Sequence, residues 1–201
     1  MVIVSLLAGI LCGYFIQSPL LGHCNEISHY ILMFLVLQAG LNIGANSDFG
    51  YMKNNFRFSS LMFPAFTVAG TLLFSAIASV FLAMNLSDGL AVGSGFGYYS
   101  LSSIMIVQFK EASVGMELAS RLGAVALLTN VFRELFALIG APLYARKFGK
   151  LAPISAAGVT SIDVCLPSIS KYSGQEYVPV AIIQGIVLEI IIPVLITFFC
   201  S

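Results

Sequence analysis

Charged residues are scarce in this sequence. Only 9% of its 201 residues are charged, whereas a soluble globular domain carries about 25%. Nine basic and nine acidic residues cannot cover the surface of a soluble protein of 21.5 kDa. The formal net charge is zero and no basic stripe is present. These absences exclude a cytosolic enzyme, a nucleic-acid-binding protein and a disordered regulator.

Paired cysteines and catalytic motifs are also missing. The four cysteines lie far apart and form no C-x-x-C pair, which argues against a disulfide framework and a zinc site. They are Cys12, Cys24, Cys165 and Cys200. No nucleophile–His–Asp set, phosphate-binding loop or nucleotide fingerprint occurs. We therefore expect no enzyme activity, no cofactor and no bound metal.

Apolar residues dominate the sequence instead. They make up 59% of it, and the mean hydropathy is +0.98. Several stretches of about 20 residues lack any charge, which is the length that spans a bilayer as a helix. A transmembrane β-barrel would alternate apolar and polar residues, and these runs do not alternate. The sequence therefore predicts an all-α, polytopic membrane protein, with residues 1–201 forming a single membrane transport domain.

Five apolar runs are predicted to span the bilayer. They cover residues 2–16, 30–44, 58–84, 119–144 and 178–199. The first run lacks the basic region and the small-residue cleavage site of a signal peptide, so we expect it to remain as a span. Pro64 and Gly70 fall inside the third run, and membrane helices tolerate such residues.

Two further segments are too rich in glycine and proline to form continuous helices. Residues 88–108 hold four glycines at near-alternate positions, and residues 151–167 hold Pro153, Gly158 and Pro167. Such interruptions are typical of broken helices or re-entrant hairpins at membrane depth. A pair of interrupted hydrophobic segments in one chain also indicates the binding site of a transporter.

Two groups of basic residues predict the orientation, because Lys and Arg accumulate on the cytoplasmic side of a membrane. The groups are Lys53 with Arg57, and Arg146 with Lys147 and Lys150. Both groups are cytoplasmic if the first interrupted segment enters and leaves from the outside and the second from the inside. If both segments crossed fully, the second basic group would lie outside, so the charges favour re-entrant segments.

Asp163 is the strongest candidate for a functional residue. It lies in a segment that we place at membrane depth, where an ionised carboxylate must face water, a partner or a substrate. It could bind a substrate ammonium group or carry a proton. The alternative is a loop residue that caps a helix with help from Thr160 and Ser161.

Three polar residues interrupt the fourth run. Arg133 and Glu134 are neighbours on the predicted helix and point in different directions, so they do not pair with each other. Asn130 lies three and four residues earlier and can contact both. These residues either serve transport or form a buried site that holds helices together.

Hydroxyl and aromatic groups follow the first set of glycines. They are Tyr98, Tyr99, Ser100, Ser102 and Ser103. Aromatic faces suit a cationic amine, and hydroxyls or freed backbone groups suit a carboxylate or an ion. The alternative is tight packing through small residues. Glu189 lies in the middle of the last run, where it could serve either a proton path or the packing of the bundle.

Four motifs, taken in order, resemble the bacterial lysine exporter LysO family. They are residues 93–102 (GSGFGYYSLS), the pair Arg133 and Glu134, residues 158–163 (GVTSID) and residues 178–183 (VPVAII). The resemblance runs through essentially the whole chain. It implies export of L-lysine and of toxic analogues such as thialysine across the bacterial inner membrane, and it implies broken helices that cross. Asp163 matches the family's motif aspartate.

The resemblance also shows departures. Full-length members are longer and carry about three additional N-terminal helices. This chain resembles their C-terminal two-thirds, so we expect either a small companion polypeptide that supplies those helices or a homo-oligomer. Asn130 stands where relatives are expected to carry a carboxylate, which affects proton handling by that helix.

The leading hypothesis is a lysine exporter subunit that exchanges lysine for protons, with sodium as the alternative coupling ion. In this hypothesis Asp163 receives the amine or the proton, residues 98–103 line the site, and Arg133 and Glu134 organise it. Two rival hypotheses are a cation-coupled carrier of an organic anion on the same architecture and a non-transporting partner subunit. All three place the chain in a lipid bilayer, without nucleic acid.

Overall fold

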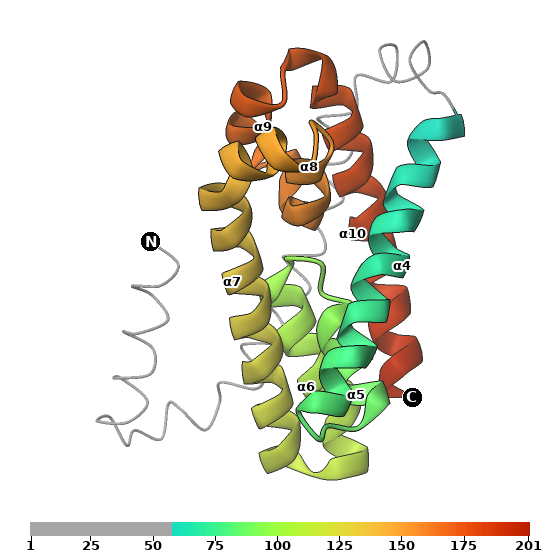
Figure 1. Cartoon of the computed structure of the whole chain (residues 1–201). Coiled ribbons are helices and arrows are strands. Elements are labelled where there is room, and N and C mark those ends of the chain that lie inside the picture. The colour runs from blue at the N-terminus through green and yellow to red at the C-terminus, as the bar shows by residue number, and fades with distance from the viewer. Residues whose placement is uncertain (1–57) are drawn as a thin grey trace, which may run out of the picture. The chain divides into compact units, whose positions relative to one another are not determined.

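The computed structural model describes residues 58–201, and all the elements in that range are helices. The predicted spans at 2–16 and 30–44 lie outside the described residues, as do Lys53 and Arg57. The elements are α4 (Phe58–Phe81), α5 (Leu86–Gly93), α6 (Tyr99–Val114), α7 (Met116–Lys147), α8 (Ala152–Ala157), η2 (Gly158–Ile162), α9 (Leu166–Tyr172), η3 (Gln175–Tyr177) and α10 (Val178–Cys200) (Figure 1).

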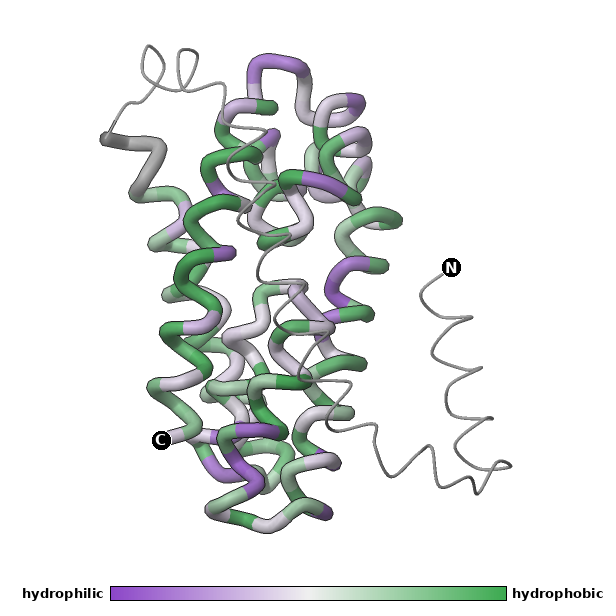
Figure 2. The backbone as a smooth tube through the Cα atoms, turned by 180° about the vertical axis from the view of Figure 1, so that it is seen from behind, coloured by the Kyte–Doolittle hydropathy of each residue, from purple (hydrophilic) through white to green (hydrophobic). Residues whose placement is uncertain are grey.

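Three of these helices are long and apolar enough to cross a membrane. The candidate spans within the described residues are Met62–Phe81, Met116–Lys147 and Gln175–Cys200. They confirm the predicted runs 58–84, 119–144 and 178–199. Figure 2 shows hydrophobic residues along the lengths of these helices and hydrophilic residues gathered mainly toward the two ends. Large side chains such as Phe74 and Phe136 remain exposed, as expected of surfaces that face lipid.

The first interrupted segment forms a hairpin made of α5, residues 94–98 and α6, which we call the first hairpin. Asp88 at the start of α5 and Lys110 near the end of α6 form an ion pair with a separation of 2.9 Å. This contact brings the two ends of the segment together, so both arms reach the same side of the molecule. The first interrupted segment therefore folds back on itself, which is the geometry that a re-entrant segment requires.

The second interrupted segment also forms a hairpin, built from α8, η2 and α9, which we call the second hairpin. Lys150 before α8 donates a hydrogen bond of 2.8 Å to the carbonyl oxygen of Tyr172 at the end of α9. Pro153 and Pro167 lie in the first turns of α8 and α9, where a missing N–H costs no helical hydrogen bond. Figure 1 shows the two hairpins at opposite ends of the long helices.

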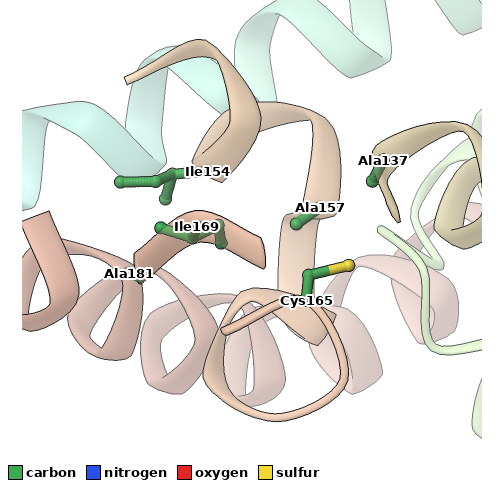
Figure 3. Close-up of a cluster of buried hydrophobic side chains, with 6 residues drawn as sticks. All are labelled: Ala137, Ile154, Ala157, Cys165, Ile169 and Ala181. Atoms are coloured by element: carbon green, nitrogen blue, oxygen red, sulfur yellow. The ribbon is translucent and has the colours of Figure 1, made fainter. Parts of the chain in front are cut away.

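Small and apolar side chains hold the second hairpin between α7 and α10. Figure 3 shows a buried cluster drawn from these elements, made of Ala137, Ile154, Ala157, Cys165, Ile169 and Ala181. Three of its six members are alanines, which allow the helix backbones to approach closely. The cluster fixes the depth to which the second hairpin enters the bundle.

Candidate functional site

The tips of the two hairpins touch each other inside the bundle. The backbone N–H of Val159 in η2 donates a hydrogen bond of 2.9 Å to the carbonyl oxygen of Phe96 in the first tip, residues 94–98. Phe96 and Gly97 both have positive φ, 44° and 98°, and they turn the chain between the end of α5 and the start of α6. Gly158 has a φ of 66°, and a Cβ there would overlap the Phe96 carbonyl oxygen. The crossing therefore requires glycine at Gly158.

Asn130 of α7 holds the first tip. Its Oδ1 accepts a hydrogen bond of 2.7 Å from the Gly97 N–H, and its Nδ2 donates to the Ala126 carbonyl at 2.8 Å. The same Nδ2 lies 3.3 Å from the Ser102 hydroxyl oxygen. A carboxylate at this position could accept the bond from Gly97 but could not donate the bonds that Nδ2 makes. The neutral amide at Asn130, only 2% exposed, therefore suits a structural role in this chain.

Arg133, almost one turn further along α7, holds the second hairpin. Its Nε donates to the carbonyl oxygen of Ala156 and its Nη2 to that of Ser155, both at 3.1 Å. These carbonyls belong to the last turn of α8, where helical partners are missing. The guanidinium carbon also lies 5.7 Å from the centroid of the Phe96 ring, within the range of a cation–π contact. Arg133 thus contacts both hairpins.

Three acidic residues gather around the crossing from three different elements. Glu134 belongs to α7 and is only 9% exposed, Asp163 follows η2 and is exposed, and Glu189 belongs to α10 and is partly buried. Asp163 is close enough to interact electrostatically with both Glu134 and Glu189. We call these three residues the carboxylate cluster, in which Asp163 is the central member.

Two consecutive tyrosines flank the carboxylate cluster. Tyr98 interacts electrostatically with Glu189 and Asp163, whereas Tyr99 interacts with Glu134 and Asp163. Both come from the point where the first tip passes into α6. Of the two outer acids, Glu134 therefore interacts with Tyr99, and Glu189 interacts with Tyr98.

Basic side chains do not neutralise the carboxylate cluster within residues 58–201. The ion pairs in this range are Asp88 with Lys110 and Glu117 with Arg121. No three His, Cys, Asp or Glu side chains of these residues are close enough to hold a metal ion. Carboxylates at membrane depth without a basic partner can bind an incoming organic cation or exchange protons.

Three other predicted site residues, Thr160, Ser161 and Ser102, form hydrogen bonds through their hydroxyl groups near the tips. Thr160 donates to the Ala157 carbonyl at 3.0 Å, and the Ser161 hydroxyl lies 2.8 Å from the carbonyl oxygens of both Gly158 and Ala181. Ser102 lies beside Asn130, and Ser100 is partly buried in the first turn of α6. The structure thus gathers the predicted acids and tyrosines around one crossing. Thr160 and Ser161 instead form hydrogen bonds to the backbone carbonyls that hold η2 in place.

Gln184 of α10 is a buried polar residue that the sequence analysis did not place in the site. It is fully buried, and neither its Oε1 nor its Nε2 has a hydrogen-bond partner in the described part of the chain. An amide in the middle of an apolar run is the signal that could have identified it. The Asp88 and Lys110 pair was also missed, because the residues become neighbours only when the first hairpin folds.

The fold and the site define a polytopic helical membrane protein of the transporter class, in which two opposed hairpins meet beside a carboxylate cluster. Comparison with known sequences agrees with this class. The sequence model of the family described as Lysine exporter LysO matches residues 3–200. The chain belongs to the lysine exporter LysO family, as its motifs indicate.

Two relatives show how much of the chain is shared. A Haemophilus influenzae protein named "Putative lysine exporter" is 31% identical over 200 residues, which cover 100% of this chain and 95% of that protein. An Escherichia coli protein named "Lysine exporter LysO" is 28% identical over 181 residues, covering 90% of this chain and 57% of that protein. The chain thus spans little more than half of the Escherichia coli relative. No solved structure matches it significantly.

Proposed function

We propose that this chain exports L-lysine, and analogues such as thialysine, across the bacterial inner membrane in exchange for protons. The observation that carries the proposal is the carboxylate cluster, which lies where the hairpin tips cross and has no basic partner in the described residues. Membership of the lysine exporter LysO family and the names of both relatives support lysine as the substrate.

The chemistry of exchange follows from the charges. The ammonium groups of lysine neutralise carboxylates of the cluster, and protons replace them when lysine leaves. Lysine carries one net positive charge, so its export against a potential that is positive outside costs about 2.3 kcal/mol per 100 mV. Inward movement of protons offsets this cost. Asp163 is the proposed centre of the exchange because it interacts with both other acids.

Assembly is a separate part of the proposal. The match covers 57% of the Escherichia coli protein, and we propose that this chain works with a small companion polypeptide that supplies the N-terminal helices of longer relatives. A homo-oligomer is the alternative assembly. Neither assembly changes the proposed role of the carboxylate cluster.

Efflux of labelled lysine from cells without their own exporter tests the function. The chain is expressed alone, with a companion that supplies the N-terminal helices, and as Asp163→Asn in each setting. We expect lysine efflux from the wild type and a loss of tenfold or more in the variant, because one charge-assisted contact is worth about 1.5–3 kcal/mol. Glu117→Gln removes an exposed carboxylate from an ion pair and should leave efflux unchanged.

The outcomes separate the hypotheses. Efflux by the chain alone identifies a self-sufficient exporter, and efflux only with the companion identifies a subunit. Absence of lysine efflux in every pairing, with membrane insertion confirmed, would overturn lysine export and favour a carrier of organic anions. Among the described residues, the arginine at the crossing is Arg133, which donates to backbone carbonyls and to the Thr71 hydroxyl, and this argues against that carrier.

A further inference from the structure

We infer that the carboxylate cluster is a two-ended site, in which the amino-acid head group lies between Glu134 and Tyr99 while Glu189 and Tyr98 hold the ammonium group of the side chain. The inference rests on the proposed function and deepens it. It assigns separate roles to the outer acids and predicts that tight binding requires both cationic groups of the substrate.

Contacts of the backbone place the two outer acids around Asp163. Gly185 of α10 packs so closely against η2 that an added Cβ would lie 2.7 Å from the Cβ of Ile162, the residue before Asp163. Glu189 lies one helical turn beyond Gly185 on the same face of α10. Glu134 belongs to α7 and directly follows Arg133, which is bonded to α8. The three carboxylates therefore approach the crossing from separate elements.

The Glu134 side has the groups that an amino-acid head requires. Helix α6 begins at Tyr99, and its cap residue Tyr98 forms no side-chain capping bond, so the first N–H groups of α6 have no helical partner. A helix N-terminus of this kind attracts a carboxylate. Beside it, Glu134 is nine-tenths buried, and no hydrogen bond or ion pair reaches its carboxylate from the described residues. A buried carboxylate without a partner suits the α-ammonium group of a ligand.

The Glu189 side offers groups that suit a second ammonium. Tyr98 and Glu189 are both partly buried and interact electrostatically with each other and with Asp163. A carboxylate together with an aromatic face and a hydroxyl binds an ammonium group through charge-assisted hydrogen bonds and cation–π attraction. Asp163 interacts with the acids of both ends, so a ligand with a cation at each end places one ammonium group at each outer acid and both within the influence of Asp163.

Competition measurements with one-ended and two-ended ligands test this inference. Everted vesicles that contain the chain, with its companion where efflux requires one, take up labelled L-lysine. The competitors are unlabelled L-lysine, norleucine, which lacks only the side-chain ammonium, and cadaverine, which lacks only the α-carboxylate. In the wild type we expect lysine to compete about tenfold to hundredfold more strongly than either analogue.

Variants at the outer acids should separate the two ends. Glu189→Gln should raise the inhibition constant of lysine to that of norleucine and leave the inhibition constant of norleucine unchanged. Glu189→Asp should restore part of the difference between the two ligands. Glu134→Gln should weaken lysine and norleucine alike. Glu117→Gln, at an exposed ion pair, is the matched control and should change neither constant. If a variant no longer transports, the ratio of the affinities for lysine and norleucine is read from the thermal stabilisation of the purified protein by each ligand.

The results distinguish this inference from the proposed function. A wild-type chain that is inserted but takes up no lysine overturns the proposed function itself. A wild type that transports lysine and a Glu189→Gln variant with the same lysine-to-norleucine ratio overturn the two-ended site alone. A selective loss of that ratio in Glu189→Gln, and not in Glu134→Gln, establishes it.

Discussion

Gly158 lies at the contact between the two hairpin tips. Its φ of 66° is costly for a residue with a side chain, and an added Cβ would overlap the Phe96 carbonyl oxygen. The left-handed conformation alone costs roughly 1–2 kcal/mol. Substitution here is therefore expected to weaken the hydrogen bond between Val159 and Phe96 that joins the tips.

The corresponding prediction concerns the stability of the purified protein. Gly158→Ala should lower the midpoint of thermal unfolding clearly, since strain and overlap add together. Gly70→Ala is the matched control, because a Cβ at Gly70 in α4 meets no atom within 4 Å. Alanine in the middle of a helix is more stable than glycine by about 0.5–1 kcal/mol, so this variant should be neutral or slightly stabilised. Equal losses in both variants would contradict the account of the crossing.

Single residues also show where sequence reasoning ends. The isolated acids Asp163 and Glu189 are predictable from sequence, because a carboxylate inside an apolar run is costly. The roles of Thr160 and Ser161 are not, since the carbonyls they bond become neighbours only when η2 turns and packs on α10. Asn130 is similar: its partners in the first tip and in α6 are 33 and 28 residues away.

At the scale of elements, α7 connects the two hairpins. Asn130 binds the first tip, and Arg133 binds the last turn of α8 through two carbonyls. The planar fork of an arginine can serve both carbonyls at once, whereas a lysine presents a single point of charge. The fit of Arg133 therefore depends on its shape as well as its charge.

Arg133→Lys should consequently destabilise the protein while keeping the net charge. The expected loss is about 2 kcal/mol, the value of one hydrogen bond that involves a charged group, and unfolding of the detergent-solubilised protein by denaturant measures it. Arg121→Lys, at an exposed pair with Glu117, is the control and should change stability by less than about 1 kcal/mol. An Arg133→Lys variant as stable as the wild type would show that charge alone suffices at this position.

The hairpins themselves illustrate what composition can predict about elements. Glycine and proline in residues 88–108 and 151–167 indicate interruption, and the basic residues indicate that the segments turn back. The contact between the tips could not be predicted, because neither segment carries a sequence signal for its partner. It results from the packing of each hairpin within the bundle, which for the second hairpin includes the cluster in Figure 3.

At the scale of the whole molecule, the two ends of the described bundle differ in charge. The end near the second hairpin carries Arg146, Lys147, Lys150, Lys171 and Glu176, for a net charge of 4 − 1 = +3. The opposite end carries Lys110, Arg121, Asp88, Glu111 and Glu117, for a net charge of 2 − 3 = −1. The positive-inside rule therefore predicts that the second hairpin opens to the cytoplasm.

Labelling of single cysteines in intact cells tests this orientation, with the native cysteines replaced by serine. Cysteines at the exposed positions Ser87 and Ser113 should both react with an impermeant maleimide from outside. Cysteines at Lys147 and Lys171 should react only after the membrane is permeabilised. Labelling of Ser87→Cys and Ser113→Cys from opposite sides would contradict the first hairpin, and labelling of all four from outside would contradict the orientation.

The bonds among the two tips and α7 have a mechanical consequence. A hydrogen bond joins Phe96 to Val159. Further hydrogen bonds join Asn130 to the first tip and Arg133 to the second hairpin. These three parts form a closed triangle of links, and in such a triangle no corner can shift alone. A displacement of one hairpin therefore strains its hydrogen bonds to the other hairpin and to α7. The links favour a concerted movement of the two hairpins over an independent movement of either one.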